Sequence, residues 1–212
     1  MILVGQYDSP FVRRVAVTLH AYRLGFERNP LSVFGDFDYL KSINPLRRVP
    51  ALILDGGEIL IDSGAIIDHL DEVVGPNRAM VPRQGPDRRR ILQLVAIAHG
   101  TAEKVVNLTL ERFFNVGHER NGKFEQRCIA QIETGLAALE KAAGAHRLAG
   151  EHMSHADVMT ACMIGHLKLR VLELFPEGTY PKLNELVTRC ELNHSFVAAR
   201  IGANETMPGK AT

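Results

Sequence analysis

The sequence predicts a small mixed α/β domain followed by an all-helical domain. Up to residue 76, short apolar runs of strand character alternate with helical patterns, whereas beyond residue 86 apolar residues recur only at helical spacing. Residues 77–86 between these parts are polar and contain two prolines and a glycine, which is typical of a linker. We therefore expect one domain at 1–76 and a second at 87–212, joined by 77–86.

The composition is that of a globular protein without a strong electrostatic field. A formal net charge of +1 over 212 residues gives no indication of nucleic-acid or membrane-surface binding. No apolar run approaches the roughly 20 residues that span a bilayer, and Met1–Gly5 is too short for a signal peptide. The three cysteines lie far apart and show no metal-ligand spacing, so a reduced, cytoplasmic protein is expected.

The first domain begins with a strand, a helix and a second strand. Met1–Gly5 has the pattern of a short buried strand, and apolar residues recur at helical spacing from Pro10 onward. Residues 26–33 are predicted to form a second strand that is interrupted at Pro30, which favours a sheet edge because proline cannot donate to the ladder. This order implies a parallel strand pair with a right-handed crossover.

A hairpin and a helix complete the first domain. Residues 35–44 are expected to form a loop with one weak helical turn. Two apolar runs, 51–54 directly after Pro50 and 58–61, flank a glycine-rich turn and therefore predict an antiparallel pair. Asp62-Ser63 precedes a helix that ends at Gly75. The sheet is therefore expected to be small, mixed and covered by helices.

The second domain is expected to be entirely helical. Its helices are predicted at residues 87–114, 123–143, 155–169, 181–190 and 194–201. Ser154 and Asp157 resemble a capping box at the start of the third of these, with Asp in place of the usual Glu or Gln. That helix is rich in small and apolar residues, so we expect it at the centre of the second core. Asn121 marks a break, and the polar tail 202–212 is expected to fray.

The turn before the first helix is where chemistry is expected. Ser9 stands directly before Pro10, at a helix N-terminus whose free N–H groups and partial positive charge favour an anion such as a thiolate. Ser9 is therefore a candidate to activate a bound thiol, although a simple N-cap is the more economical interpretation of this stretch alone. Arg13 and Arg14 occupy the first turn, where the helix dipole disfavours cations, which indicates specific partners or solvated surface positions. Carboxylates across a dimer interface or from the second domain are the expected partners.

Four features, in this order, resemble the cytosolic glutathione S-transferase family, in its Ser-type (tau-, phi-, zeta-like or bacterial) classes. They are Ser9-Pro10-Phe11 with Arg13-Arg14, Val49-Pro50 before the hairpin, Asp62-Ser63 before the next helix, and the Ser154 to Asp157 box. The resemblance covers almost the whole chain. It implies a thioredoxin-like first domain with a four-stranded mixed sheet that binds glutathione as co-substrate, a helical second domain that forms the electrophile site, and a homodimer.

The resemblance also implies roles for residues near the first helix and the hairpin. Ser9 would donate a hydrogen bond to the glutathione sulfur. Tyr7 is the alternative, because other classes of the family use a tyrosine near the end of the first strand. Val49 would pair its backbone with the cysteinyl part of glutathione if Val49-Pro50 is a cis peptide, and an ordinary trans proline is the alternative.

Two further residues correspond to the family's γ-glutamyl site. Ser63 would hold the γ-glutamyl carboxylate and Asp62 the ammonium group, although the family usually has Glu at the position of Asp62. Capping of the following helix is compatible with both roles. Arg48, and after it Lys41, are candidates to bind the glycine carboxylate, with solvated surface charges as the alternative.

The electrophile site is expected on the second domain, and no metal site is expected. Its candidate wall residues are His99, Glu103, Val106, Phe113 and His166. The nine histidines include no H-x-x-x-H pair with an obvious acidic partner, which argues against zinc. His152 and His155, which flank a predicted helix start, are expected to face solvent.

The function implied by the resemblance is glutathione transfer to an electrophilic carbon of an apolar small molecule, a detoxification reaction. Glutathione-dependent isomerisation, dehalogenation or peroxide reduction on the same fold are alternatives. A non-catalytic interaction module is a further alternative, because a fold does not determine its chemistry. Thiol–disulfide exchange is not expected, since the first domain contains no cysteine.

Overall fold

The computed structural model describes residues 1–116, 122–144 and 147–205. The described residues form two compact units, one of residues 1–79 together with 192–205, and one of residues 80–191. The junction between the units therefore lies within the predicted linker 77–86, whereas residues 192–205 fold with the first unit. The expected break at Asn121 and the tail residues 206–212 lie outside the described residues.

The first unit contains a four-stranded mixed sheet. Its strands β1 (Ile2–Val4), β2 (Glu27–Asn29), β3 (Ala51–Ile53) and β4 (Ile59–Ile61) lie in the order β2-β1-β3-β4. β1 pairs parallel with β2 and antiparallel with β3, and β3 pairs antiparallel with β4. The mixed sheet and the edge position of the second strand are thus confirmed. That strand is shorter than predicted and ends just before Pro30, which has no N–H to continue the ladder.

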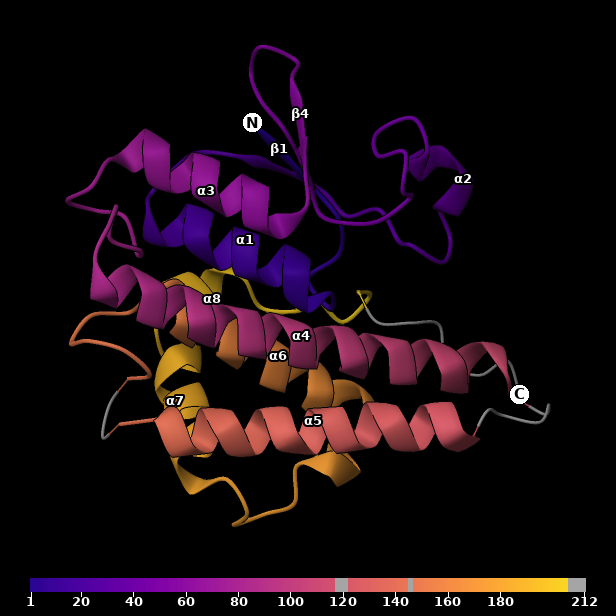
Figure 1. Cartoon of the computed structure of the whole chain (residues 1–212). Coiled ribbons are helices and arrows are strands. Elements are labelled where there is room, and N and C mark those ends of the chain that lie inside the picture. The colour runs from indigo at the N-terminus through magenta and orange to yellow at the C-terminus, as the bar shows by residue number, and fades with distance from the viewer. Residues whose placement is uncertain (117–121, 145–146, 206–212) are drawn as a thin grey trace. The chain divides into compact units, whose positions relative to one another are not determined.

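Helices cover both faces of this sheet. The unit contains α1 (Pro10–Ala21), the single turn α2 (Phe37–Leu40), α3 (Ser63–Val74) and α8 (His194–Ala198), and Figure 1 shows α1 and α3 side by side. Leu40 of α2 packs with Val4 and Ala51 on one face. Leu3 and Leu52 alternate with those residues and are buried on the other face, where α1 contacts β1 and α3 contacts β3.

The second unit is a helical bundle around one buried helix. It contains α4 (Pro86–Phe114), α5 (Gly122–Ala142), α6 (His155–Arg170), the short 3₁₀ helix η1 (Leu172–Leu174) and α7 (Pro181–Glu191). α4 packs against both α5 and α6, and Figure 1 shows α4 and α5 lying alongside each other. Burial continues around most of α6, from His155 through Ile164, which confirms that this helix forms the centre of the second core.

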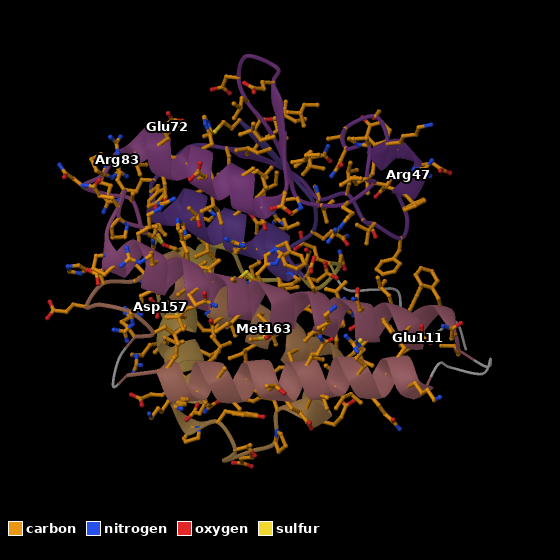
Figure 2. All side chains as sticks on the ribbon, viewed as in Figure 1. Arg47, Glu72, Arg83, Glu111, Asp157 and Met163 are labelled. Carbon is orange, nitrogen blue, oxygen red and sulfur yellow. The ribbon has the colours of Figure 1, made fainter. Side chains whose placement is uncertain are left out.

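A capping box begins α6, as predicted. Asp157, labelled in Figure 2, is fully buried and accepts hydrogen bonds from the Ser154 N–H and hydroxyl, both at 2.8 Å, and from the Leu148 N–H at 2.9 Å. His152 is exposed as expected, but the prediction for His155 was wrong, because His155 is 2% exposed. The reason is that α6 is enclosed on nearly all sides, so that even its first residue is buried in the core.

Candidate functional site

Ser9 caps the N-terminus of α1 at the end of the turn that follows β1. Its side-chain oxygen accepts a hydrogen bond from the Val12 N–H at 3.4 Å, and Pro10 occupies the first turn. Ser9 is half-buried. A hydroxyl has one proton to donate and two lone pairs to accept, so the capping bond leaves the Ser9 proton available to a second partner. The N-cap and the thiol donor considered from the sequence are therefore compatible roles.

Tyr7 lies in the same turn, but its side chain is enclosed. It is 1% exposed, and its buried hydroxyl oxygen has no hydrogen bond of normal geometry among the described residues. The Arg28 guanidinium carbon lies 3.6 Å from the centre of the Tyr7 ring. Burial raises the pKa of the Tyr7 phenol, an effect that Arg28 partly opposes. Of the two residues considered for thiol contact, Ser9 therefore has the more accessible hydroxyl.

Gly5 allows the turn that carries Ser9 (residues 5–9, here called the Ser9 turn) to approach Val49-Pro50, the segment before β3. Gly5 has a φ of 124°, and a Cβ built there would lie 2.6 Å from Val12 Cγ2 and 2.9 Å from Val49 Cβ. Only glycine adopts such a φ readily and tolerates this contact. The Val49-Pro50 peptide is cis, as the resemblance implied. The backbone of half-buried Val49 is thus placed beside the first turn of α1.

The N-terminus of α3 is the third part of this region. The Asp62 carboxylate accepts from the Gly64 N–H at 2.7 Å and so caps α3, at an exposed residue with a φ of 67°. Ser63 is 2% exposed, and its hydroxyl accepts from Nη1 of Arg14 at 3.4 Å. Arg14 itself is 3% exposed. The buried Arg14 cation therefore lies beside Ser63, the residue that the resemblance expects to bind the γ-glutamyl carboxylate of glutathione.

The two predicted cations near the hairpin are surface residues. Lys41 and Arg48 are exposed, and the Arg48 carbonyl accepts from Asn44 Nδ2 at 2.8 Å. The side chains of Lys41 and Arg48 are thus open to solvent, whereas that of Arg14 is buried. Their role in binding the glycine carboxylate remains a prediction.

The candidate electrophile residues belong to the second unit. His99, Glu103, Val106 and Phe113 are half-buried on α4, at spacings that bring them to one side of that helix. His166 on α6 is 7% exposed. Among residues 1–116, 122–144 and 147–205, no three His, Cys, Asp or Glu side chains are grouped so as to hold a metal ion. Within the same ranges, no helix combines the length and apolar character needed to cross a membrane.

Sequence reasoning missed several contacts that surround Ser9. Arg13 donates from Nε to the Ala199 carbonyl at 3.0 Å, so this partner is a backbone oxygen from the later part of the chain. The Glu205 carboxylate accepts from the Tyr7 N–H at 3.3 Å and forms an ion pair with Arg28. No local pattern relates residues this far apart. Only a glycine at the end of a strand, Gly5, carried a sequence signal of close backbone approach.

Comparison with known proteins identifies the family. Residues 3–78 match the glutathione S-transferase N-terminal domain, and residues 109–189 match the glutathione S-transferase C-terminal domain. Glutathione S-transferase Z1 of Arabidopsis thaliana is 31% identical over 86% of this chain and 85% of its own length. Maleylacetoacetate isomerase of Mus musculus is 28% identical over 90% of this chain and 89% of its own length.

Solved structures agree with these matches. A glutathione transferase family member from Pseudomonas fluorescens Pf-5, crystallised with bound glutathione, superposes with a TM-score of 0.82 and is 29% identical. The match covers 95% of this chain and 98% of that chain. Both domain matches fall in the order expected from the sequence, a thioredoxin-like part before a helical part. The chain belongs to the glutathione S-transferase family.

Proposed function

We propose that this protein is a glutathione transferase in which the Ser9 hydroxyl donates a hydrogen bond to the glutathione sulfur. The observation that carries the proposal is the position of half-buried Ser9 at the N-terminus of α1, with its oxygen engaged by the Val12 N–H and its proton available to a ligand. The burial of the Tyr7 hydroxyl supports Ser9 over Tyr7. Family membership and the glutathione bound to the Pseudomonas relative support glutathione as the thiol.

A donor at this place changes the fraction of reactive thiolate. A free thiol with a pKa of about 8.5 is only about 3% ionised at pH 7. Lowering that pKa by about two units makes about three quarters of it thiolate. A hydroxyl donor and the partial positive charge of the α1 N-terminus together are able to supply the roughly 2–3 kcal/mol that such a shift requires.

The α3 N-terminus and the segment before β3 are proposed to hold the peptide part of glutathione. Ser63, beside the buried Arg14 guanidinium, takes the γ-glutamyl carboxylate, and exposed Asp62 takes the ammonium group. The Val49 backbone pairs with the cysteinyl backbone in the manner of an added strand. Arg48, with Lys41 second, provides charge for the glycine carboxylate.

In the proposed reaction, the thiolate sulfur forms a bond to an electrophilic carbon of an apolar small molecule. When the electrophile is an aryl halide, the halide leaves with the bonding electron pair, and the thiol proton has already passed to solvent. The half-buried residues on α4 and His166 on α6 are proposed to contact the electrophile. We further propose a cytoplasmic homodimer with a role in detoxification, supported by the family and by three buried cysteines, none of which forms a disulfide within the described part of the chain.

A second candidate is glutathione-dependent isomerisation, favoured by the similarity to mouse maleylacetoacetate isomerase. The two reactions differ in their balance, because conjugation consumes glutathione and isomerisation regenerates it. Measuring free thiol before and after turnover of an unsaturated acid therefore separates them. Dehalogenation is distinguished by halide release without a glutathione conjugate among the products, and peroxide reduction by the formation of oxidised glutathione.

Substitution of Ser9 tests the proposed role of its hydroxyl. Ser9→Ala is expected to lower kcat/KM for conjugation of an aryl chloride by up to about 25-fold at pH 7, the ratio of the two thiolate fractions above. The deficit should fall away above about pH 9, where glutathione ionises without help. Ser9→Thr retains both the hydroxyl and the cap, and Tyr7→Phe removes the alternative hydroxyl, so both are expected to stay within about twofold of wild type.

Three results would contradict the proposal. Unchanged activity of Ser9→Ala would remove Ser9 from the reaction, and a large loss in Tyr7→Phe would transfer the role to Tyr7. A wild-type protein that neither binds immobilised glutathione nor conjugates any electrophile would favour a non-catalytic interaction module.

A further inference from the structure

The segment from Ala199 to Glu205, here called the closing segment, returns to the first unit and ends on the Ser9 turn. Glu205 is 8% exposed. One of its carboxylate oxygens accepts from the Tyr7 N–H at 3.3 Å and from the Gly202 N–H at 3.2 Å. Its other oxygen forms an ion pair with Arg28 of β2. A buried carboxylate thus holds a backbone donor two residues before Ser9.

The other end of the closing segment binds Arg13, which follows Ser9 in the sequence. The Ala199 carbonyl accepts from Arg13 Nε at 3.0 Å, and the Arg13 guanidinium carbon lies 5.6 Å from the centre of the Phe196 ring in α8. Arg13 is 4% exposed, so this bond is shielded from water. The closing segment therefore makes hydrogen bonds on both sides of Ser9, at Tyr7 and at Arg13.

Arg28 and the Tyr7 N–H both bind the Glu205 carboxylate. The Arg28 side chain, 40% exposed, lies over the Tyr7 ring on one side and pairs with Glu205 on the other. The Tyr7 N–H needs an acceptor because the residue is buried, and a buried donor without one costs about 1–3 kcal/mol. Loss of the Glu205 carboxylate would therefore favour a shift of the turn that brings this donor to another acceptor.

We propose that Glu205 is a positioning residue for the reaction: its hydrogen bond to the Tyr7 N–H fixes the turn that carries Ser9 at the distance its hydroxyl needs to stabilise a bound thiolate. This inference rests on the proposed role of Ser9. Misplacement of a reacting group by about 1 Å is enough to slow a reaction up to about 100-fold, and a shift of one turn by a fraction of that distance costs less. Within the described ranges, no hydrogen bond joins Glu205 to Val49 or Ser63, so glutathione binding itself is expected to persist.

Two substitutions at Glu205 and one control test the proposal in the full-length protein. Glu205→Ala removes both oxygens, whereas Glu205→Gln keeps an oxygen acceptor for the Tyr7 N–H and loses the charge that pairs with Arg28. Glu185→Gln is the control, because Glu185 also pairs with an arginine, Arg189, but at an exposed position of α7 in the second unit. The measurements are kcat and the KM for glutathione with an aryl chloride, and the pKa of the bound glutathione thiol from the ultraviolet absorbance of the thiolate.

Glu205→Ala is expected to lower kcat about tenfold at pH 7 and to raise the bound-thiol pKa by about one unit, with the KM for glutathione within about twofold of wild type. Glu205→Gln is expected to lie between Glu205→Ala and wild type, and it carries the test if Glu205→Ala does not fold. Glu185→Gln should match wild type in all three quantities.

Two outcomes overturn the inference while the proposed function stands. In one, wild type is active and both Glu205 variants keep its kcat and bound-thiol pKa, even if they unfold more easily, which leaves Glu205 a purely structural role. In the other, KM rises while kcat and the thiol pKa stay unchanged, which makes Glu205 part of glutathione binding. A wild-type protein that neither binds glutathione nor lowers its thiol pKa overturns the proposed function, and the inference with it.

Discussion

Replacing Gly5 with alanine tests how the first unit brings the Ser9 turn and the Val49 segment together. A Cβ at Gly5 would meet Val12 Cγ2 at 2.6 Å and Val49 Cβ at 2.9 Å. Val12 is fully buried, so its methyl group has no open space to move into. The substitution therefore has to move the Val49 segment or the first turn of α1.

The expected destabilisation has two parts. A φ of 124° costs a residue with a side chain about 1–3 kcal/mol, and overpacking typically costs a further 1–3 kcal/mol. Gly5→Ala should thus lower the free energy of unfolding by about 2–6 kcal/mol, a large share of the roughly 5–15 kcal/mol of a typical protein. Gly57→Ala is the matched control, because Gly57 has a φ of 84° but no atom within 4 Å of an added Cβ.

Urea unfolding followed by circular dichroism measures the loss of stability. Calorimetric titration with glutathione, below the unfolding transition, measures the change in glutathione affinity. Gly5→Ala should raise the Kd for glutathione at least about tenfold, equivalent to about 1.4 kcal/mol, because the Val49 backbone is displaced. Gly57→Ala should lose only the conformational part of the stability and bind as wild type does. Equal stability of the two variants, together with an unchanged Kd in both, would refute the importance of this contact.

The remaining predictions concern stability and thiol chemistry. Gly135→Ala should destabilise the protein by about 1–3 kcal/mol in urea unfolding, because its Cβ would lie 2.0 Å from the Thr101 hydroxyl oxygen. Gly100→Ala, where an added Cβ meets open space, should stabilise it by about 0.5–1 kcal/mol. A Gly135→Ala variant more stable than Gly100→Ala would contradict the packing. Burial raises the pKa of Cys190 to about 12, so alkylation of this thiol at pH 8 should require unfolding, and rapid labelling of folded protein would be inconsistent with its position. Burial lowers the pKa of His20 in the folded protein below its usual 6.5. His20 therefore binds a proton more strongly in the unfolded state, and its contribution to stability is lost as the pH falls below about 6.5. Melting temperatures should therefore decline more steeply from pH 7.5 to 5.5 in wild type than in His20→Gln, and parallel curves would contradict this.

The features that could be predicted from the sequence are those set by neighbouring residues. The Ser9 cap lies one position before the helix it starts, and Asp157 closes its capping box with a residue three positions away. The hairpin pairs two strands across a short turn, so its register is decided within about ten residues. In each case a side chain or a turn satisfies backbone groups close to it in the chain, and the pattern of residue types contains that information.

The contacts that could not be predicted join distant residues. Arg14 and Ser63 are 49 positions apart, and Glu205 and Tyr7 are 198 apart. Helical periodicity indicates which face of α8 is buried but not which helix it meets, and α8 packs on α1 of the first unit. For this reason the sequence did not predict that residues 192–205 fold with the first unit, although it did predict a helix at the position of α8, which is shorter than expected.

These distant contacts also explain the two arginines that the helix dipole disfavours. The first turns of α4, α5 and α6 each contain an acidic residue, whereas those of α1 and α3 contain none. α7 lacks one as well, so this absence alone does not mark a site. What distinguishes α1 is that Arg13 and Arg14 are both buried and hydrogen-bonded, to the Ala199 carbonyl and the Ser63 hydroxyl. Fixed in this way, they add positive potential to a helix end that is already positive, which is unfavourable for an empty helix terminus and favourable for one that binds an anion.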